Sequence, residues 1–175
     1  MVAKHRMFSW IPQAVLPADP LIVLARAEEI VVGVLHSKTH ALWARGTGTQ
    51  IGEAESGLRY TPTTTFETYP FPWAPGHEPT DDPRVAAIAE AARRLVDLRD
   101  RWLNPPDIAA AELKKRTLTN LYNARPTWLD NAHNTLDRAV CDAYGWPHDL
   151  GDDDLLARLL ALNAARFGVG TSGAG

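Results

Sequence analysis

Apolar residues follow two different spacings along this chain. In the first part they form short runs at 7–11 and 21–24, separated by a proline-containing loop, which predicts two buried strands joined by a turn-rich connection. Residues 28–43 carry a helical stripe of apolar positions that a glycine-rich stretch ends. Residues 59–69 are rich in threonine and aromatic side chains, which suits a further strand. The first 75 residues are therefore expected to combine strands with a helix.

Beyond a proline-rich connector at 70–76, apolar residues recur at three- and four-residue steps, as on one face of a helix. Asp82 is expected to cap the first helix, with Pro83 at its first position. Four helices are expected, from Pro83 to Asn104, from Asp107 to about Tyr122, from about Pro126 to Gly145, and from about Asp152 to Phe167. The last helix would place carboxylates at its positive end and bury Leu155, Leu156, Leu159, Leu160 and Phe167.

This pattern predicts an α+β fold in two units. Residues 1–75 would form a small mixed unit, residues 76–170 a helical domain, and residues 171–175 a disordered tail of small residues. The tryptophan and leucine faces of the helical domain, at Trp102, Trp128 and Leu159, would pack against the first unit. The helical domain is thus expected to be structural.

The composition excludes only a few classes of function. A net charge of −3 and a pI near 6.0 lack the basic excess of a self-sufficient nucleic-acid binder. The single cysteine, Cys141, cannot form an internal disulfide, and no apolar stretch approaches the ~20 residues that cross a bilayer. The sequence therefore predicts a cytoplasmic protein without a membrane partner.

One tetrapeptide, Asn104-Pro105-Pro106-Asp107, is close to the Asn-Pro-Pro-aromatic motif with which adenine methyltransferases hold a flipped base. An acid stands where the aromatic ring is needed, and the tetrapeptide follows a helix. It is interpreted as a helix stop followed by an N-cap. The Pro106-Asp107 and Glu112-x-Lys114 spacing of some metal-dependent nucleases is also present, but in a segment expected to be helical.

Other candidate motifs have simpler interpretations. His36 and His40 are four residues apart, but no third metal ligand and no general-base glutamate accompany them. The glycines at 46, 48 and 52 follow a helix, whereas nucleotide-binding loops follow a strand. They suit a surface loop or close approach to a DNA backbone. The acids at 149 and 152–154 are interpreted as helix capping rather than as a metal site. No metal is expected.

The densest basic run is Lys114-Lys115-Arg116. Together with Arg93, Arg94 and Arg101 it would form either a strip that faces phosphates or an ordinary solvated helix face. The sequence leaves both interpretations open.

Three stretches carry a family resemblance. They are Gly33-Val-Leu-His-Ser-Lys-Thr-His-Ala-Leu-Trp43, Arg59-Tyr-Thr-Pro62 and Phe66-Glu-Thr-Tyr-Pro-Phe-Pro-Trp73. They closely resemble the closing part of the target-recognition domain of MmeI-like methyltransferases. Leu118-Thr-Asn-Leu-Tyr-Asn123, Trp128-Leu129, Ala132-His133, Leu136-Asp137 and Ala143-Tyr-Gly-Trp146 are similar to the family's carboxyl-terminal helical region.

The resemblance implies a piece of a restriction-modification DNA methyltransferase. The full-length enzyme would move a methyl group from S-adenosylmethionine to adenine N6 at a short DNA sequence. This chain lacks the cofactor and Asn-Pro-Pro-aromatic motifs, so it is expected to hold no cofactor and no catalytic residue, and to be inactive alone. Its partners would be double-stranded DNA and a catalytic portion, in the same or a separate polypeptide. Met1 would begin inside the recognition domain, as in a truncated frame or one half of a split gene.

Six residues are candidates for phosphate or base-edge contacts: Lys4, Arg6, Lys38, His40, Arg45 and Arg59. Lysine and arginine suit this role because they carry charge and, for arginine, paired donors that match guanine's major-groove acceptors. The alternative is a non-enzymatic helical scaffold that binds a protein partner, which accounts equally well for the acidic second part.

Overall fold

The computed structural model describes residues 5–12, 14–17, 21–50 and 58–170. Its helices are α1 (Glu29–His36), α2 (Lys38–Thr47), α3 (Pro83–Leu103), α4 (Ala110–Leu113), α5 (Leu118–Ala124), α6 (Thr127–Tyr144) and α7 (Asp152–Gly170), with a π-helical turn η1 (Pro62–Phe66). Two short strands, β1 (Thr49–Gln50) and β2 (Leu58–Arg59), pair antiparallel. None of the helices described is both long and apolar enough to span a membrane.

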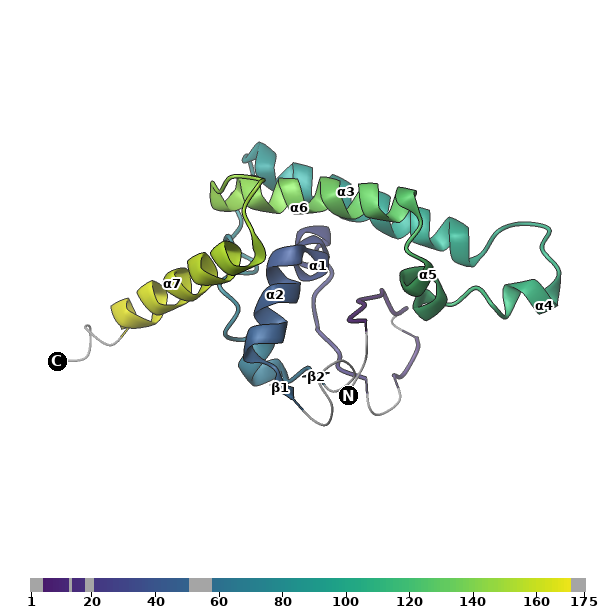
Figure 1. Cartoon of the computed structure of the whole chain (residues 1–175), viewed down its shortest axis with the longest axis horizontal. Coiled ribbons are helices and arrows are strands. Elements are labelled where there is room, and N and C mark those ends of the chain that lie inside the picture. Colours follow the sequence, from purple (N-terminus) through teal and green to yellow (C-terminus); the bar gives the residue numbers. More distant parts are fainter. Residues whose placement is uncertain (1–4, 13, 18–20, 51–57, 171–175) are drawn as a thin grey trace.

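Two long helices organise the molecule (Figure 1). α3 runs toward α4, and α6 returns alongside it toward α7. α1 packs against both α3 and α6, whereas α2 packs against α1, η1, α6 and α7. Figure 1 shows α7 projecting from one end of the α3–α6 pair and the short α4 from the other.

The fold is helical, so the prediction of an α+β class was wrong. In the described part of the chain, extended pairing is limited to Thr49 with Arg59 and Gln50 with Leu58. Such a pair is too short to bury an apolar face, and it only links the end of α2 to the segment before η1.

The three predicted strands are the source of this error. Residues 7–11 and 21–24 form no ladder with any described residue. Met7, Phe8 and Leu24 pack partly against the core, but none of these residues is fully buried, and Trp10 and Val23 are 44% and 59% exposed. Within residues 59–69, Pro62–Phe66 forms a turn of π-helix that begins with the proline, and the Thr68 hydroxyl donates to the Thr64 carbonyl. Apolar and β-branched composition favoured strands, but a strand needs a partner to pair with, and tertiary packing supplied helices instead.

The helix boundaries predicted from caps were largely confirmed. Asp82 accepts a hydrogen bond from the Arg84 amide at the start of α3, and α3 ends at Leu103. Gly145 ends α6 with φ of +69°, a conformation that glycine adopts without strain. α7 begins at Asp152, as expected, but Leu160 is 51% exposed rather than buried. The side chain of Phe167 lies outside the described part of α7.

Two helix predictions need correction. The stripe at 28–43 forms two helices, because Ser37 is extended and its hydroxyl accepts from the His40 amide to cap α2. The helix expected from Asp107 to Tyr122 is divided into α4 and α5. Asp107 has a φ of +58° and is not an N-cap, and Thr117 caps α5 instead.

One hydrophobic core spans the connector at 70–76. Its fully buried members include Val34 of α1, Leu95 of α3, Leu136 of α6 and Leu159 of α7. Packing is therefore continuous across residue 75, and the division into residues 1–75 and 76–170 stays a prediction about function. The predicted tail at 171–175 lies outside the described residues.

Close contact between α1 and α3 depends on Gly33. A Cβ at this position would lie 2.7 Å from Ile88 Cγ2 and 3.3 Å from the Ile88 carbonyl oxygen, and Ile88 is completely buried. We expect Gly33→Ala to lower the free energy of unfolding by about 1–3 kcal/mol, because overpacking outweighs the gain in helix propensity. Urea unfolding followed by circular dichroism measures this difference.

The matched control is Gly46→Ala in α2. A Cβ there would meet Leu156 Cδ1 at 3.5 Å, an ordinary contact. This variant should be stabilised by up to about 1 kcal/mol, because alanine favours the helix. An equal gain for both variants would contradict close packing at Gly33.

Candidate nucleic-acid interface

Arg6 and Arg45 are 39 positions apart in sequence, yet they are near enough for the charge of Arg45 to act on the Arg6 guanidinium. Arg6 belongs to the segment that precedes α1, and Arg45 is exposed in the last turn of α2. Burial lowers the pKa of the Arg6 guanidinium, and the positive charge of Arg45 lowers it further. The two positive charges therefore interact unfavourably within the fold.

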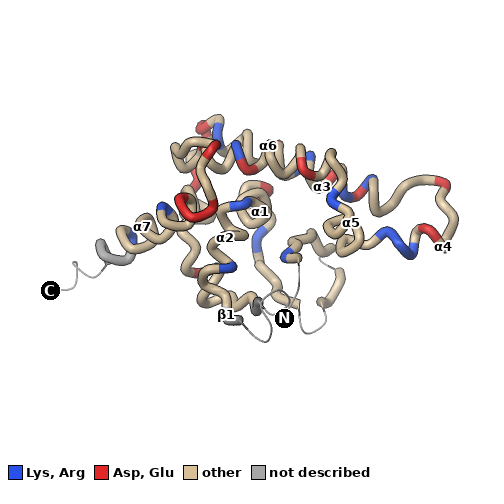
Figure 2. Tube along the Cα trace, in the orientation of Figure 1, with Lys and Arg blue, Asp and Glu red and all other residues tan. Residues whose placement is uncertain are grey.

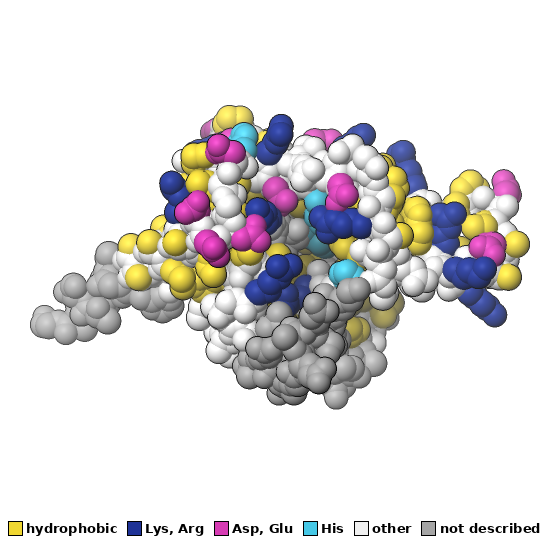
Figure 3. Space-filling view, viewed as in Figure 1, with side chains coloured by type: hydrophobic (Ala, Val, Ile, Leu, Met, Phe, Trp, Pro, Cys, Tyr) yellow, Lys and Arg dark blue, Asp and Glu magenta, His cyan; other side chains and the backbone are white. Residues whose placement is uncertain are grey.

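No carboxylate of the described residues lies within 4.0 Å of either guanidinium. In addition, the Arg6 Nε is buried and has no hydrogen-bond acceptor in the part of the chain that the structure describes. A pair of guanidiniums without a counter-charge attracts an anion, and a phosphate offers oxygens that match the fork of arginine donors. Figure 3 shows Lys and Arg side chains where the described surface meets the grey region below α1 and α2.

His40 is buried and acts on the surroundings of Arg6 only through its hydrogen bond with Tyr60. It is 1% exposed; its Nδ1 donates to the Leu35 carbonyl at 2.9 Å, and its Nε2 accepts from the Tyr60 hydroxyl at 3.1 Å. Burial lowers the pKa of His40 to about 4, so the ring is neutral near neutral pH. Burial also raises the pKa of Tyr60, which keeps its hydroxyl protonated as the donor. His40 thus fixes Tyr60 beside Arg6, and its ring has no exposed nitrogen to offer a DNA base.

Lys38 is seven residues before Arg45 on α2, so the two lie on the same side of the helix about 10 Å apart. Its ammonium is paired with Asp152 at 2.7 Å, and its backbone amide donates to Asp137 at 2.7 Å. A phosphate would have to compete with Asp152 for Lys38. Lys38 therefore lies on the same side of α2 as Arg45, but Asp152 already balances its charge.

The remaining candidates are only partly placed. The backbone of Arg59 lies in β2 opposite Thr49, which brings it next to the end of α2. Its side chain, Lys4 and the glycine-rich stretch from residue 51 onward lie outside the described residues, whereas Gly46 lies in α2 and Gly48 ends it. Tyr60, which the sequence analysis did not select, joins Arg6, Arg45 and His40 in the cluster.

The basic run at Lys114, Lys115 and Arg116 lies elsewhere. It follows α4 at the far end of the molecule from α2 (Figure 2). Arg116 lies over the Trp102 ring at 4.8 Å, and Lys115 pairs with Glu112 at 2.8 Å. Glu112, the acid of the nuclease-like spacing, thus makes an ordinary surface ion pair.

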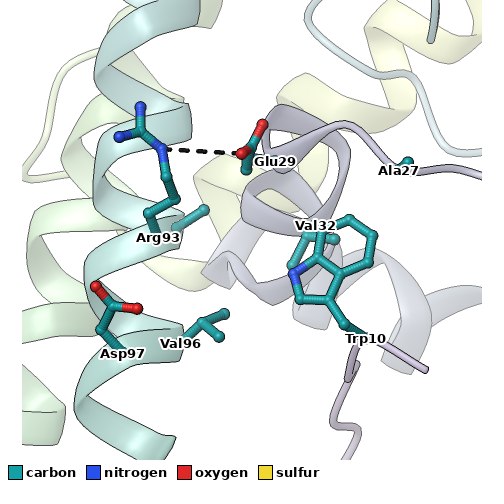
Figure 4. Close-up of a pocket in the computed structure, with 8 residues that line it drawn as sticks. Trp10, Ala27, Glu29, Val32, Arg93, Val96 and Asp97 are labelled. Carbon is teal, nitrogen blue, oxygen red and sulfur yellow. Dashed lines mark ion pairs between the residues drawn. The ribbon is translucent and has the colours of Figure 1, made fainter. Parts of the chain in front are cut away.

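A surface pocket of about 290 Å³ lies between α1, α3 and Trp10 (Figure 4). Val32 and Val96 give it an apolar floor, and Arg93 is bound to Glu29 at 3.9 Å. Asp97 adds a second carboxylate, so acids outnumber bases. This pocket does not suit a phosphate.

The described residues contain no arrangement suited to metal or nucleophilic chemistry. They hold no group of three or more histidine, cysteine, aspartate or glutamate side chains that could bind a metal. His36 and His40 each use both ring nitrogens within the protein. Burial raises the pKa of the Cys141 thiol, which disfavours the reactive thiolate.

Comparison with known proteins gives one informative similarity. No family model matches the chain, and no curated protein sequence matches it. Among solved structures, the chain aligns with the type IIL restriction-modification enzyme MmeI, determined in complex with DNA, with 27% identity and a TM-score of 0.63. The chain is similar to part of MmeI. The alignment covers 81% of this chain and 17% of the MmeI chain, so this chain corresponds to a small part of that enzyme.

Proposed function

We propose that this chain is a DNA-contacting portion of a restriction-modification enzyme and that the Arg6–Arg45 cluster binds the phosphate backbone. The similarity to MmeI over most of the chain carries this proposal. The guanidiniums of Arg6 and Arg45 support it, because neither has a carboxylate partner among the described residues and phosphate contacts supply much of the affinity of proteins for DNA. Lys38 and Arg59 would extend the contact along α2 and β2.

In the complete enzyme, methyl transfer from S-adenosylmethionine to adenine N6 would take place in another portion. This chain would then supply grip and orientation on the duplex, with the helices from α3 onward bracing the DNA-facing surface. Residues 1–75 would contain the contacts, and residues 76–170 would support them.

Salt-dependent binding to duplex DNA tests the proposal. Fluorescence anisotropy of a labelled duplex of mixed sequence, from about 50 to 200 mM salt, should show affinity falling linearly on logarithmic axes. We expect Arg45→Ala to weaken binding about tenfold and to reduce the slope by about 0.9, the value for one phosphate contact. Absence of salt-dependent binding by the wild-type chain would contradict the proposal.

Arg158→Ala is the matched control, because Arg158 is exposed on α7 and belongs to neither of the two basic groups described above. It removes the same charge and should change the affinity by less than about twofold. Equal weakening by both variants would assign the effect to net charge and not to the Arg6–Arg45 cluster.

A protein-binding scaffold is the second candidate, and a specific observation favours it. Residues 10–23 expose several large apolar side chains, among them Leu16, which is 94% exposed. Exposed apolar patches often mark protein interfaces. A scaffold would bind no duplex at any of the salt concentrations above.

A further inference from the structure

The segment that carries Arg6 is attached to three helices. His5 Nε2 is 2.9 Å from Asn123 Oδ1 at the end of α5. The Phe8 amide donates to His36 Nε2 at 3.2 Å, and the Phe8 carbonyl accepts from Arg99 Nη2 at 3.0 Å. Arg6 lies between these attachments, so its position depends on them.

Arg99 is the unusual member of this set. It lies near the carboxyl end of α3 and is 2% exposed, and no described carboxylate lies within 4.0 Å of it. Its guanidinium donates to neutral acceptors only: the Phe8 carbonyl, His36 Nε2 at 2.8 Å and the Tyr122 hydroxyl at 3.4 Å. A buried cation of this kind is costly, and an apolar residue of similar volume is often equally stable. Stability alone therefore does not account for an arginine here.

The contact between Arg99 and His36 requires a neutral histidine ring. His36 Nδ1 donates to the Val32 carbonyl at 2.9 Å, so Nε2 is the acceptor for both Arg99 and the Phe8 amide. The Phe8 ring then packs edge-on against His36, with 5.4 Å between ring centroids, and reaches Tyr60 at 6.1 Å. Both backbone polar groups of Phe8 and its ring are fixed two residues after Arg6.

We infer that Arg99 is a positioning residue, which holds residues 5–8 so that Arg6 lies beside Arg45 ready to bind a phosphate. This inference rests on the proposed function. Holding the segment in advance lowers the ordering cost of binding, and the arginine fork is suited to the task because it reaches two acceptors at once. A lysine offers one compact ammonium and cannot bridge the Phe8 carbonyl and His36 with the same geometry.

A double-mutant cycle in the whole chain tests the inference. Arg6→Ala and Arg99→Met are each expected to weaken binding to the labelled duplex about tenfold. In the double variant, Arg99→Met should add less than about a twofold effect, because the group it positions is already gone. Arg99→Lys should recover only part of the affinity. Independent losses that multiply, or unchanged affinity of Arg99→Met, would overturn the inference.

Hydrogen exchange supplies a readout that does not depend on DNA. Arg99→Met should accelerate exchange at the Phe8 amide and its neighbours, while the midpoint of urea unfolding changes little. Asn123→Ala, at an exposed site, loosens the same segment at its other end and should act similarly without loss of the fold. If the wild-type chain binds no duplex, the proposed function fails, but the exchange data still decide whether Arg99 holds the segment. Unchanged exchange in both variants would show that it does not.

Discussion

Acidification from about pH 7 to about pH 4 is expected to unfold this chain, because three buried histidines must gain protons that the folded state disfavours. Burial is the largest cause in each case. It lowers the pKa of His36 to about 3, with a further contribution from the Arg99 charge, and lowers the pKa of His40 and of His133 to about 4. The unfolded chain takes up these protons near pH 6.5.

The sign of the pH dependence of stability follows from these pKa values. Each histidine contributes its full stability above pH 6.5, and that stability is lost as the pH falls from 6.5 toward the folded pKa. A single histidine with a shift of this size contributes roughly 3 kcal/mol, and three together reach a large part of the usual stability of a domain, about 5–15 kcal/mol. Asp137 acts in the opposite sense, because burial raises its pKa to about 6 and its contribution is lost as the pH rises. One group does not offset three.

Urea midpoints followed by circular dichroism at about pH 7, 6, 5 and 4 measure the effect. His133→Gln should make the decline less steep by about one proton, because the amide can hold the Tyr122 hydroxyl without titrating. His77→Gln, at an exposed histidine, is the control and should leave the profile in place. A midpoint that stays constant between pH 7 and 5 would show that the three rings are not buried as described.

Leu159→Ala is expected to lower the free energy of unfolding by about 2–5 kcal/mol. Leu159 is 0% exposed and belongs to the main core, which joins α7 to the rest of the molecule. α7 packs on α2, so the cavity would open next to the helix that carries Arg45. Urea unfolding of the variant and the wild type gives the difference.

Leu160→Ala is the control, since Leu160 is its neighbour on the same helix but is 51% exposed. Its effect should stay within about 0.5 kcal/mol, because leucine and alanine have similar helix propensities. Similar losses for both variants would contradict the packing of α7 described above.

Elements with strong local signals could be predicted from the sequence. The start of α3 at Asp82 and Pro83 and the end of α6 at Gly145 depend on backbone conformations that few residue types favour. These positions were predicted correctly. Ser37 gave a similar signal, but the apolar stripe runs through it and concealed the break between α1 and α2.

The strand predictions failed for a different reason. The runs at 7–11 and 21–24 have the composition of strands, but a strand is stable only with a neighbour that other parts of the chain must supply. Sequence periodicity does not show whether that neighbour exists. Here the segment at 5–8 is attached through single hydrogen bonds to Asn123, His36 and Arg99.

The candidate site residues were predicted from residue type alone, and the structure then shows where the described ones lie. Arg6 and Arg45 were selected because of their charge, and only the fold shows that they lie together. His40 was selected for its polarity, and the structure places it in the interior. Arg99 gave a signal that was overlooked: it follows Ile88, Ala92 and Leu95 on the apolar stripe of α3, where a charge is unusual.

The core that runs through the connector at 70–76 limits how such proteins can recombine. A crossover at residue 75 would unite α1 and α2 of one parent with α3, α6 and α7 of another, and side chains shaped for different neighbours would meet at Gly33 and Leu159. Chimaeras joined before Glu29 keep these helices from a single parent. Chimaeras joined at residue 75 should therefore fold less stably than chimaeras joined before Glu29.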